Sequence, residues 1–213
     1  MEIKTEEQEL VCAVCGEKSS QTVVVEYEPD RSVPDLDMRP GEPHRSYIKY
    51  WVSKCPHCGY CNASIEIPAL FTKEYLQSAN YNQYGDSLAG RFMKMSLVCE
   101  KNKVYEEALK ACLYAAWTFD DVGNDEKARE CRRAAVRIFD SHRALFSEKP
   151  DYVLVAADIM RRSGNYERVI SDYKGRFFHS GLMTAIAAFE AELAEKGDSD
   201  CHRADEAPGV TVK

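Results

Sequence analysis

The chain has 213 residues, of which 45% are hydrophobic and 30% charged, and its formal net charge is −7 at pH 7. This is the composition of an ordinary folded protein, and the acidic excess argues against a broad surface for nucleic-acid backbones. Residues 1–70 are no exception, with seven Lys+Arg against twelve Asp+Glu. The acidic first residues lack the basic and apolar regions of a secretion signal, and no apolar run is long enough to cross a bilayer. We therefore expect a cytoplasmic protein with no membrane segment.

Two C-x-x-C-G motifs mark the N-terminal part, Cys12-Ala13-Val14-Cys15-Gly16 and Cys55-Pro56-His57-Cys58-Gly59. The two-residue spacer lets both sulfurs of a motif reach one ion, and the glycine permits the left-handed turn that directs backbone N–H groups at them. Two such half-sites predict one zinc ion per chain, held by Cys12, Cys15, Cys55 and Cys58. Four thiolates leave no open position, so a structural zinc is expected. A redox pair, the alternative, would require a thioredoxin-like βαβ context that the sequence lacks.

The other cysteines and the nearby histidines are weaker candidates. Cys61 forms a second, overlapping C-x-x-C with Cys58, so it is either an alternative ligand or redox-sensing thiol, or a packed and inert one. His44 and His57 are expected to be solvated or to lie beside the ligands. The remaining thiols within helical patterns are expected in the core; they are Cys99, Cys112 and Cys131.

The residues around the motifs predict a small sheet. Strands are expected over the β-branched segment 21–27, the aromatic segment 47–53 and the alternating segment 63–67. Residues 29–46 contain four prolines and are predicted as an inserted loop, which puts 39 residues between Cys15 and Cys55 instead of the ~15–20 usual between knuckles. We therefore predict a zinc-ribbon-like β module over residues 1–70, which depends on its ion for stability.

From residue 71 onward the hydrophobic period changes from two to 3.6. Helices are predicted over 86–101, 104–121, 125–146, 151–163, 166–177 and 181–195, with a further short helix within 71–85. The short breaks between them predict antiparallel neighbours over residues 71–196, and residues 197–213 are predicted as a disordered tail. The predicted fold class is α+β, mostly α.

Three turns in this part are similar to those of tetratricopeptide repeats, at residues 102–108, 123–128 and 164–169. Small residues recur where helix axes would approach to about 8–10 Å, at Ala108, Ala115, Ala128 and Ala135. The turns are separated by about 20 and 41 residues instead of a constant 34, which indicates a degenerate tetratricopeptide-like (TPR-like) antiparallel array.

Residues 10–195 resemble an uncharacterised bacterial family of unknown function that combines a two-knuckle, zinc-ribbon-like module with tetratricopeptide-like helices. The matching residues are Cys12, Cys15, Gly16, Tyr50, Trp51, Cys55, Pro56, His57, Cys58, Gly59 and Tyr60. The chain departs from the pattern at Ala13, where proline is more usual, and at Cys61, where a small residue is expected. The resemblance implies an architecture and no activity.

The helical part is rich in arginine. Arg129, Arg133 and Arg137 are spaced by four residues and predict one basic stripe, which either pairs with Glu126, Glu130 and Asp140 or binds a carboxylate or phosphate group. Further arginines occur at 132, 143, 161, 162 and 168.

We expect an adaptor or scaffold that binds a protein or acidic peptide through its helices, because helical arrays offer extended surfaces to partners. The alternative is a nucleic-acid-associated regulator that uses the ribbon, which the charge disfavours. A third class is an enzyme with a site between ribbon and helices, around His44, His57 and Cys61; no nucleophile elbow or glycine-rich phosphate loop supports it.

Overall fold

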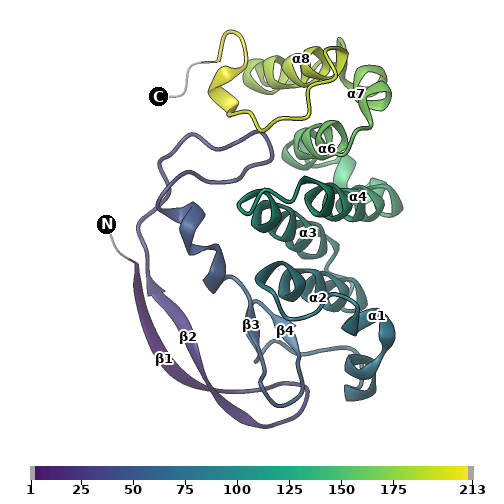
Figure 1. Cartoon of the computed structure of the whole chain (residues 1–213). Coiled ribbons are helices and arrows are strands. Elements are labelled where there is room, and N and C mark those ends of the chain that lie inside the picture. Colours follow the sequence, from purple (N-terminus) through teal and green to yellow (C-terminus); the bar gives the residue numbers. More distant parts are fainter. Residues whose placement is uncertain (1–2, 211–213) are drawn as a thin grey trace. The chain divides into compact units, whose positions relative to one another are not determined.

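The computed structural model describes residues 3–210, and its contacts divide the chain into two compact units. The first comprises Met1–Pro29 and Pro43–Cys131, and the second comprises Asp30–Glu42 and Arg132–Lys213. The prediction of an α+β fold that is mostly α is confirmed (Figure 1).

The strands of the first unit form two hairpins, and each hairpin turn is a cysteine knuckle (Figure 1). Strand β1 (Lys4–Val11) pairs antiparallel with β2 (Lys18–Glu26), and the register ends at the Val11–Lys18 pair beside the first knuckle. Strand β3 (Ser53–Lys54) pairs with β4 (Cys61–Asn62) across the second. The extra residues between Cys15 and Cys55 therefore separate two hairpins and do not interrupt either of them.

Two of the predicted strands are wrong. The 3-10 helix η1 (His44–Tyr50) includes residues 47–50 of the strand predicted over 47–53, and of that segment only Ser53 belongs to β3. Within 63–67 the backbone turns, because the Ile67 N–H donates to the Ser64 carbonyl. Neither segment pairs with a strand in the described part of the chain beyond the short β3–β4 ladder. Strand β1, by contrast, was not predicted. Its residues are mostly charged or polar, so they show no alternation of apolar and polar side chains.

Helices complete the first unit. They are η2 (Lys73–Gln77), α1 (Ala79–Asn82), α2 (Leu88–Lys101) and α3 (Tyr105–Asp120). Helices α2 and α3 are joined by a short turn and pack along their lengths through Ala108, Ala111 and Ala115, which have no exposed surface. Side chains from both knuckles share one core with Leu76, Tyr81 and Val98. The domain boundary predicted after residue 70 falls inside this unit.

The second unit is helical. It contains the greater part of α4 (Asp125–Ser141), followed by α5 (Arg143–Ser147), α6 (Pro150–Arg162), α7 (Tyr166–Tyr173), α8 (Gly181–Glu195) and the 3-10 helix η3 (Ala204–Glu206). Helix α6 packs against α5, α7 and α8. The single helix predicted over 125–146 ends at Ser141, and α5 begins after His142, whose backbone is not helical. The similarity of the turns to tetratricopeptide repeats stays a prediction.

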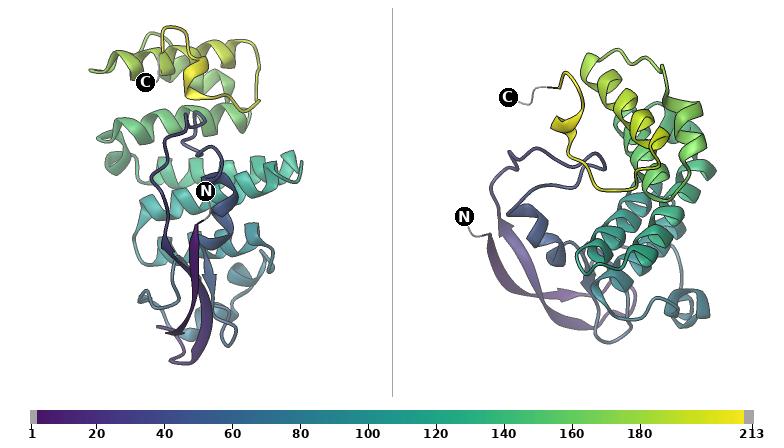
Figure 2. Two further views of the ribbon diagram at one scale, coloured as in Figure 1. Left: turned by 90° about the vertical axis from the view of Figure 1, so that its left-hand side faces the viewer. Right: turned by 45° about the horizontal axis from the view of Figure 1, so that its top comes forward.

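The C-terminal segment differs from the predicted disordered tail. The Leu36 N–H donates to the His202 carbonyl at 2.9 Å, and the Ala204 N–H donates to the Pro34 carbonyl at 2.9 Å. The tail thus lies beside part of the proline-rich loop within the second unit (Figure 2). These hydrogen bonds satisfy backbone groups of both segments, and Leu36 and Ala207 are buried. Both segments are therefore ordered. Residues 211–213 lie outside the described part.

Candidate metal centre

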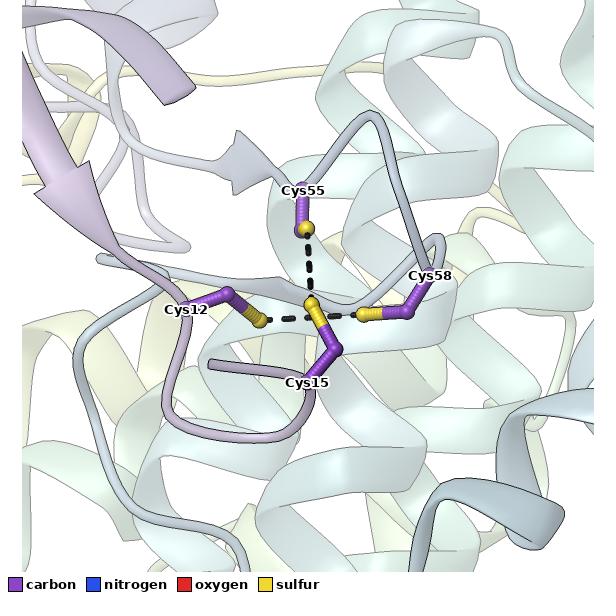
Figure 3. Close-up of side chains that lie close together, drawn as sticks. All are labelled: Cys12, Cys15, Cys55 and Cys58. Atoms are coloured by element: carbon purple, nitrogen blue, oxygen red, sulfur yellow. Dashed lines mark hydrogen bonds between the residues drawn. The ribbon is translucent and has the colours of Figure 1, made fainter. Parts of the chain in front are cut away.

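The sulfurs of Cys12, Cys15, Cys55 and Cys58 converge on one point (Figure 3). All four lie within 4.8 Å of one another, and the Cys12–Cys58 and Cys15–Cys55 sulfur pairs are each 3.7 Å apart. A tetrahedral ion with metal–sulfur bonds of ~2.3 Å requires sulfurs about 3.8 Å apart. The four residues predicted from the two motifs can therefore hold one metal ion.

The backbone of each knuckle is folded in the same way. The Gly16 N–H donates to the Cys12 carbonyl at 2.8 Å, and the Gly59 N–H donates to the Cys55 carbonyl at 3.0 Å. The φ angles of Gly16 and Gly59 are 75° and 79°, in the region that favours glycine. The spacing and the glycine thus bring both thiols of each motif to the same side of its turn.

The surroundings of the sulfurs favour a cation. Cys12, Cys55 and Cys58 are buried, and burial raises the pKa of the Cys12 and Cys58 thiols. Burial also acts on Cys15, but the Glu17 backbone N–H and the neighbouring thiols outweigh it and lower its pKa. Several thiolates in this buried space would repel one another. A divalent ion would compensate their charge, and its binding would release protons.

Two tyrosines support the second knuckle. The Tyr81 hydroxyl, from α1, donates to the Gly59 carbonyl at 2.9 Å and accepts from the Cys61 N–H at 3.0 Å. The Tyr60 hydroxyl donates to the Ile67 carbonyl at 2.8 Å. Burial raises the pKa of Tyr60 to about 12, so it is a neutral donor at ordinary pH. Nothing in the sequence around Tyr81 identifies this hydrogen-bonding role, because its partners lie about 20 residues away along the chain.

The remaining candidates near the knuckles lie outside the four-sulfur cluster. Cys61 is fully buried with its sulfur 3.4 Å from the Gly59 carbonyl, and burial raises the pKa of its thiol, which opposes reactivity. The His57 Nε2 atom is 3.1 Å from the Lys18 carbonyl, and the His44 Nε2 atom is 2.6 Å from the Glu28 carbonyl. Both histidines therefore contact backbone.

The three arginines of the predicted stripe lie on α4. Arg129, Arg133 and Arg137 are all exposed and share one face of the helix. None of the three makes an ion pair within residues 3–210. Two of the carboxylates considered for them have other partners: Glu130 pairs with Lys127 at 2.7 Å, and Asp140 pairs with Arg168 at 2.8 Å.

Other arginines from the same part of the sequence are buried in the second unit. Arg161 is fully buried and contacts Glu190 at 2.6 Å and Asp158 at 2.8 Å. Arg162 contacts Asp37 of the proline-rich loop at 3.2 Å. We call the group formed by Asp37, Arg132, Asp158, Arg161, Arg162 and Glu190 the buried ion cluster. Neither Asp158 nor Glu190 was predicted as a site residue. The sequence signal for burial here is the apolar run that precedes Arg161.

Burial raises the pKa of Glu190 to about 8, and the neighbouring Asp158 adds to the shift. The Glu190 Oε1 and Asp158 Oδ2 atoms accept no hydrogen bond within the described part of the chain. A carboxylate oxygen that accepts no hydrogen bond favours the protonated form of its carboxyl group over the ionised form. The stability of the second unit should therefore depend on pH through this cluster.

Comparisons with protein-family models, curated proteins and solved structures find no match to this chain. The resemblance to a bacterial family therefore stays a prediction. None of the helices between residues 3 and 210 combines the length and apolar character required to span a bilayer.

Proposed function

We propose that the chain is a zinc-stabilised adaptor that binds a protein or acidic peptide through its helices. The observation that carries the structural part is the tetrahedral spacing of four cysteine sulfurs. A closed four-sulfur shell is typical of zinc or iron and leaves no position for a substrate. Zinc is the ion we propose, since two C-x-x-C knuckles at hairpin turns resemble those of zinc-ribbon modules.

The partner surface that we propose is the arginine stripe, Arg129, Arg133 and Arg137. Its three guanidinium groups are exposed and make no ion pair within residues 3–210, although the chain as a whole has a net charge of −7. Arginine binds carboxylates through two parallel hydrogen bonds, so a row of them suits an acidic peptide. The absence of internal partners supports binding over the alternative of a self-paired helix surface.

Native mass spectrometry tests the metal. We expect one zinc ion per chain, which is lost at low pH because the four thiolates take up protons and no longer bind it. Iron in place of zinc, or a folded protein with no bound metal, would contradict the proposal.

A quantitative pull-down tests the surface. The Arg129→Glu/Arg133→Glu variant should recover at least about tenfold less partner, since each charged hydrogen bond contributes ~1.5–3 kcal/mol. The control, Arg143→Glu/Lys174→Glu, makes the same charge change at exposed positions off α4. Equal recovery from both variants would exclude the stripe. Tight, steeply salt-dependent binding of DNA or RNA in a gel-shift titration would favour a nucleic-acid regulator instead.

A further inference from the structure

A cationic cavity lies in the first unit. It has a volume of about 500 Å³ and is formed by β2, the segment from η1 to the second knuckle, and α2. Its lining contains three cations and no carboxylate; the residues are Gln21, Thr22, Lys49, Tyr50, Val52, Ser53, Lys54, Pro56 and Arg91. A cavity of this size suits a small molecule.

The positive charge of this cavity is only partly compensated. Lys54 contacts Asp86 at 2.6 Å, but the same carboxylate also contacts Lys94 at 3.3 Å, so one negative charge serves two lysines. Lys49 and Arg91 form no ion pair within the described residues. The Arg91 Nε atom is buried and has no hydrogen-bond acceptor. Arg91 lines the cavity, so an anion there would compensate the charge of its guanidinium group.

Hydroxyl groups beside these cations are also available. The side chains of Tyr50 and Ser53 make no hydrogen bond within residues 3–210. The Thr22 hydroxyl donates to Glu7, and the Gln21 amide donates to Ser19 and to the Lys54 carbonyl. An arginine fork, an ammonium group and two free hydroxyls around one space match the three acceptor oxygens of a phosphate.

An aromatic cavity of about 440 Å³ adjoins the cationic one and shares Thr22, Tyr50 and Ser53 with it. Aromatic rings dominate its lining; they are Tyr27, His44, Tyr47, Tyr50 and Trp51. The rings of Tyr27, His44 and Tyr47 meet edge to face, with centroids 6.1 and 5.9 Å apart, although Tyr27 is 66% exposed. The exposed ring of Tyr27 at the edge of this group favours the packing of a flat apolar group against it.

We infer that the two cavities form one binding site for a small aromatic phosphate ester, with the phosphate at Arg91 and Lys49 and the ring among the tyrosines. This site is independent of the partner surface on α4, so either proposal can fail while the other stands.

Titration calorimetry of the full, metal-loaded chain tests the inference with phenyl phosphate and methyl phosphate as probes. Phenyl phosphate should bind about tenfold more tightly, because only its ring can be buried in the aromatic cavity. Arg91→Gln should weaken both probes by at least about tenfold, as expected for losing a hydrogen bond to a charged group. Lys73→Gln, a charge-matched change of an exposed lysine outside the cavity, should leave both affinities unchanged.

Three results would overturn it. Equal affinity for the two probes would exclude the aromatic half of the site, and unchanged affinity in Arg91→Gln would exclude the cationic half. Amide chemical-shift changes confined to α4 would place the anion at the arginine stripe. If Arg91→Gln lacks the metal content or the circular dichroism of the parent, the exposed Lys49→Gln serves as the variant, with a smaller loss of the same sign expected.

Discussion

The cysteine knuckles and the buried ion cluster are two solutions to the same problem, the burial of groups that carry charge. The knuckles gather four thiols from two short motifs, and the charge of their thiolates would be compensated by an ion from outside the chain. The cluster gathers Arg161, Asp158 and Glu190 from two helices, and the chain supplies both signs itself. The comparison predicts that the stability of the first unit depends on metal supply, whereas that of the second depends on pH.

The largest expected effect is loss of the metal. Cys55→Ser should abolish stoichiometric zinc binding and unfold the knuckle hairpins, because structural zinc contributes ~10 kcal/mol or more to modules of this kind. Metal content and circular dichroism measure both effects. Cys61→Ser is the matched control. It replaces a buried thiol three residues after Cys58 that lies outside the four-sulfur cluster, so this variant should retain the ion. Metal loss in the control, or a folded and metal-loaded Cys55→Ser, would disprove the four-sulfur site.

The next effect concerns the second unit. Arg161→Ala should destabilise it by about 3–5 kcal/mol, since it leaves Asp158 and Glu190 buried without their shared cation. Arg168→Ala removes an arginine from a partly exposed pair with Asp140 and should cost ~1 kcal/mol or less. Urea unfolding measures both. Equal losses would mean that the buried contacts do not differ in strength from those at the surface.

The two regions should also respond differently to pH. The pKa of Glu190 is raised to about 8 from an ordinary value of 4.5, so the folded state binds the extra proton between these values. Its contribution is therefore fully present below pH 4.5 and is lost as pH rises toward 8, with a slope of at most ~1.4 kcal/mol per pH unit.

Glu190→Gln should remove this slope from the free energy of unfolding measured in urea at pH 5, 6.5 and 8. The exposed Glu195→Gln, whose partner is Lys174, should keep it. If the free energies of unfolding of the parent and of Glu190→Gln differ by the same amount at all three pH values, Glu190 is ionised throughout this range.

The smallest effect lies in the knuckle turn. Gly59→Ala forces a left-handed backbone on alanine and should cost about 1–2 kcal/mol, with the metal retained. Gly181→Ala at the start of α8 meets no atom within 4 Å and should be neutral or slightly stabilising. Thermal unfolding of the zinc-loaded proteins separates the two. A Gly59→Ala protein as stable as the parent would exclude strain in this turn.

Features determined by residues close together in the sequence could be predicted, whereas those determined by distant residues could not. The convergence of the four sulfurs was predictable because the spacing within Cys12–Cys15 and within Cys55–Cys58 determines where each pair of sulfurs points. Most helices were predictable from their apolar period. Residues 47–50 became a 3-10 helix because strand formation needs a neighbouring edge, which the sequence does not reveal. The pairing of Arg161 with Glu190 joins positions 29 residues apart and left no local pattern.

The anchored tail has a practical consequence for anyone preparing this protein. Arg161 donates to the Asp198 and Asp200 carbonyls at 3.1 and 2.9 Å. A chain shortened to residue 197 would lack these two carbonyl acceptors and leave the buried guanidinium with only its carboxylate partners. Bacterial expression of such a truncation should give insoluble or protease-sensitive material. Affinity tags should therefore be joined beyond residue 210, where they leave these carbonyls in place.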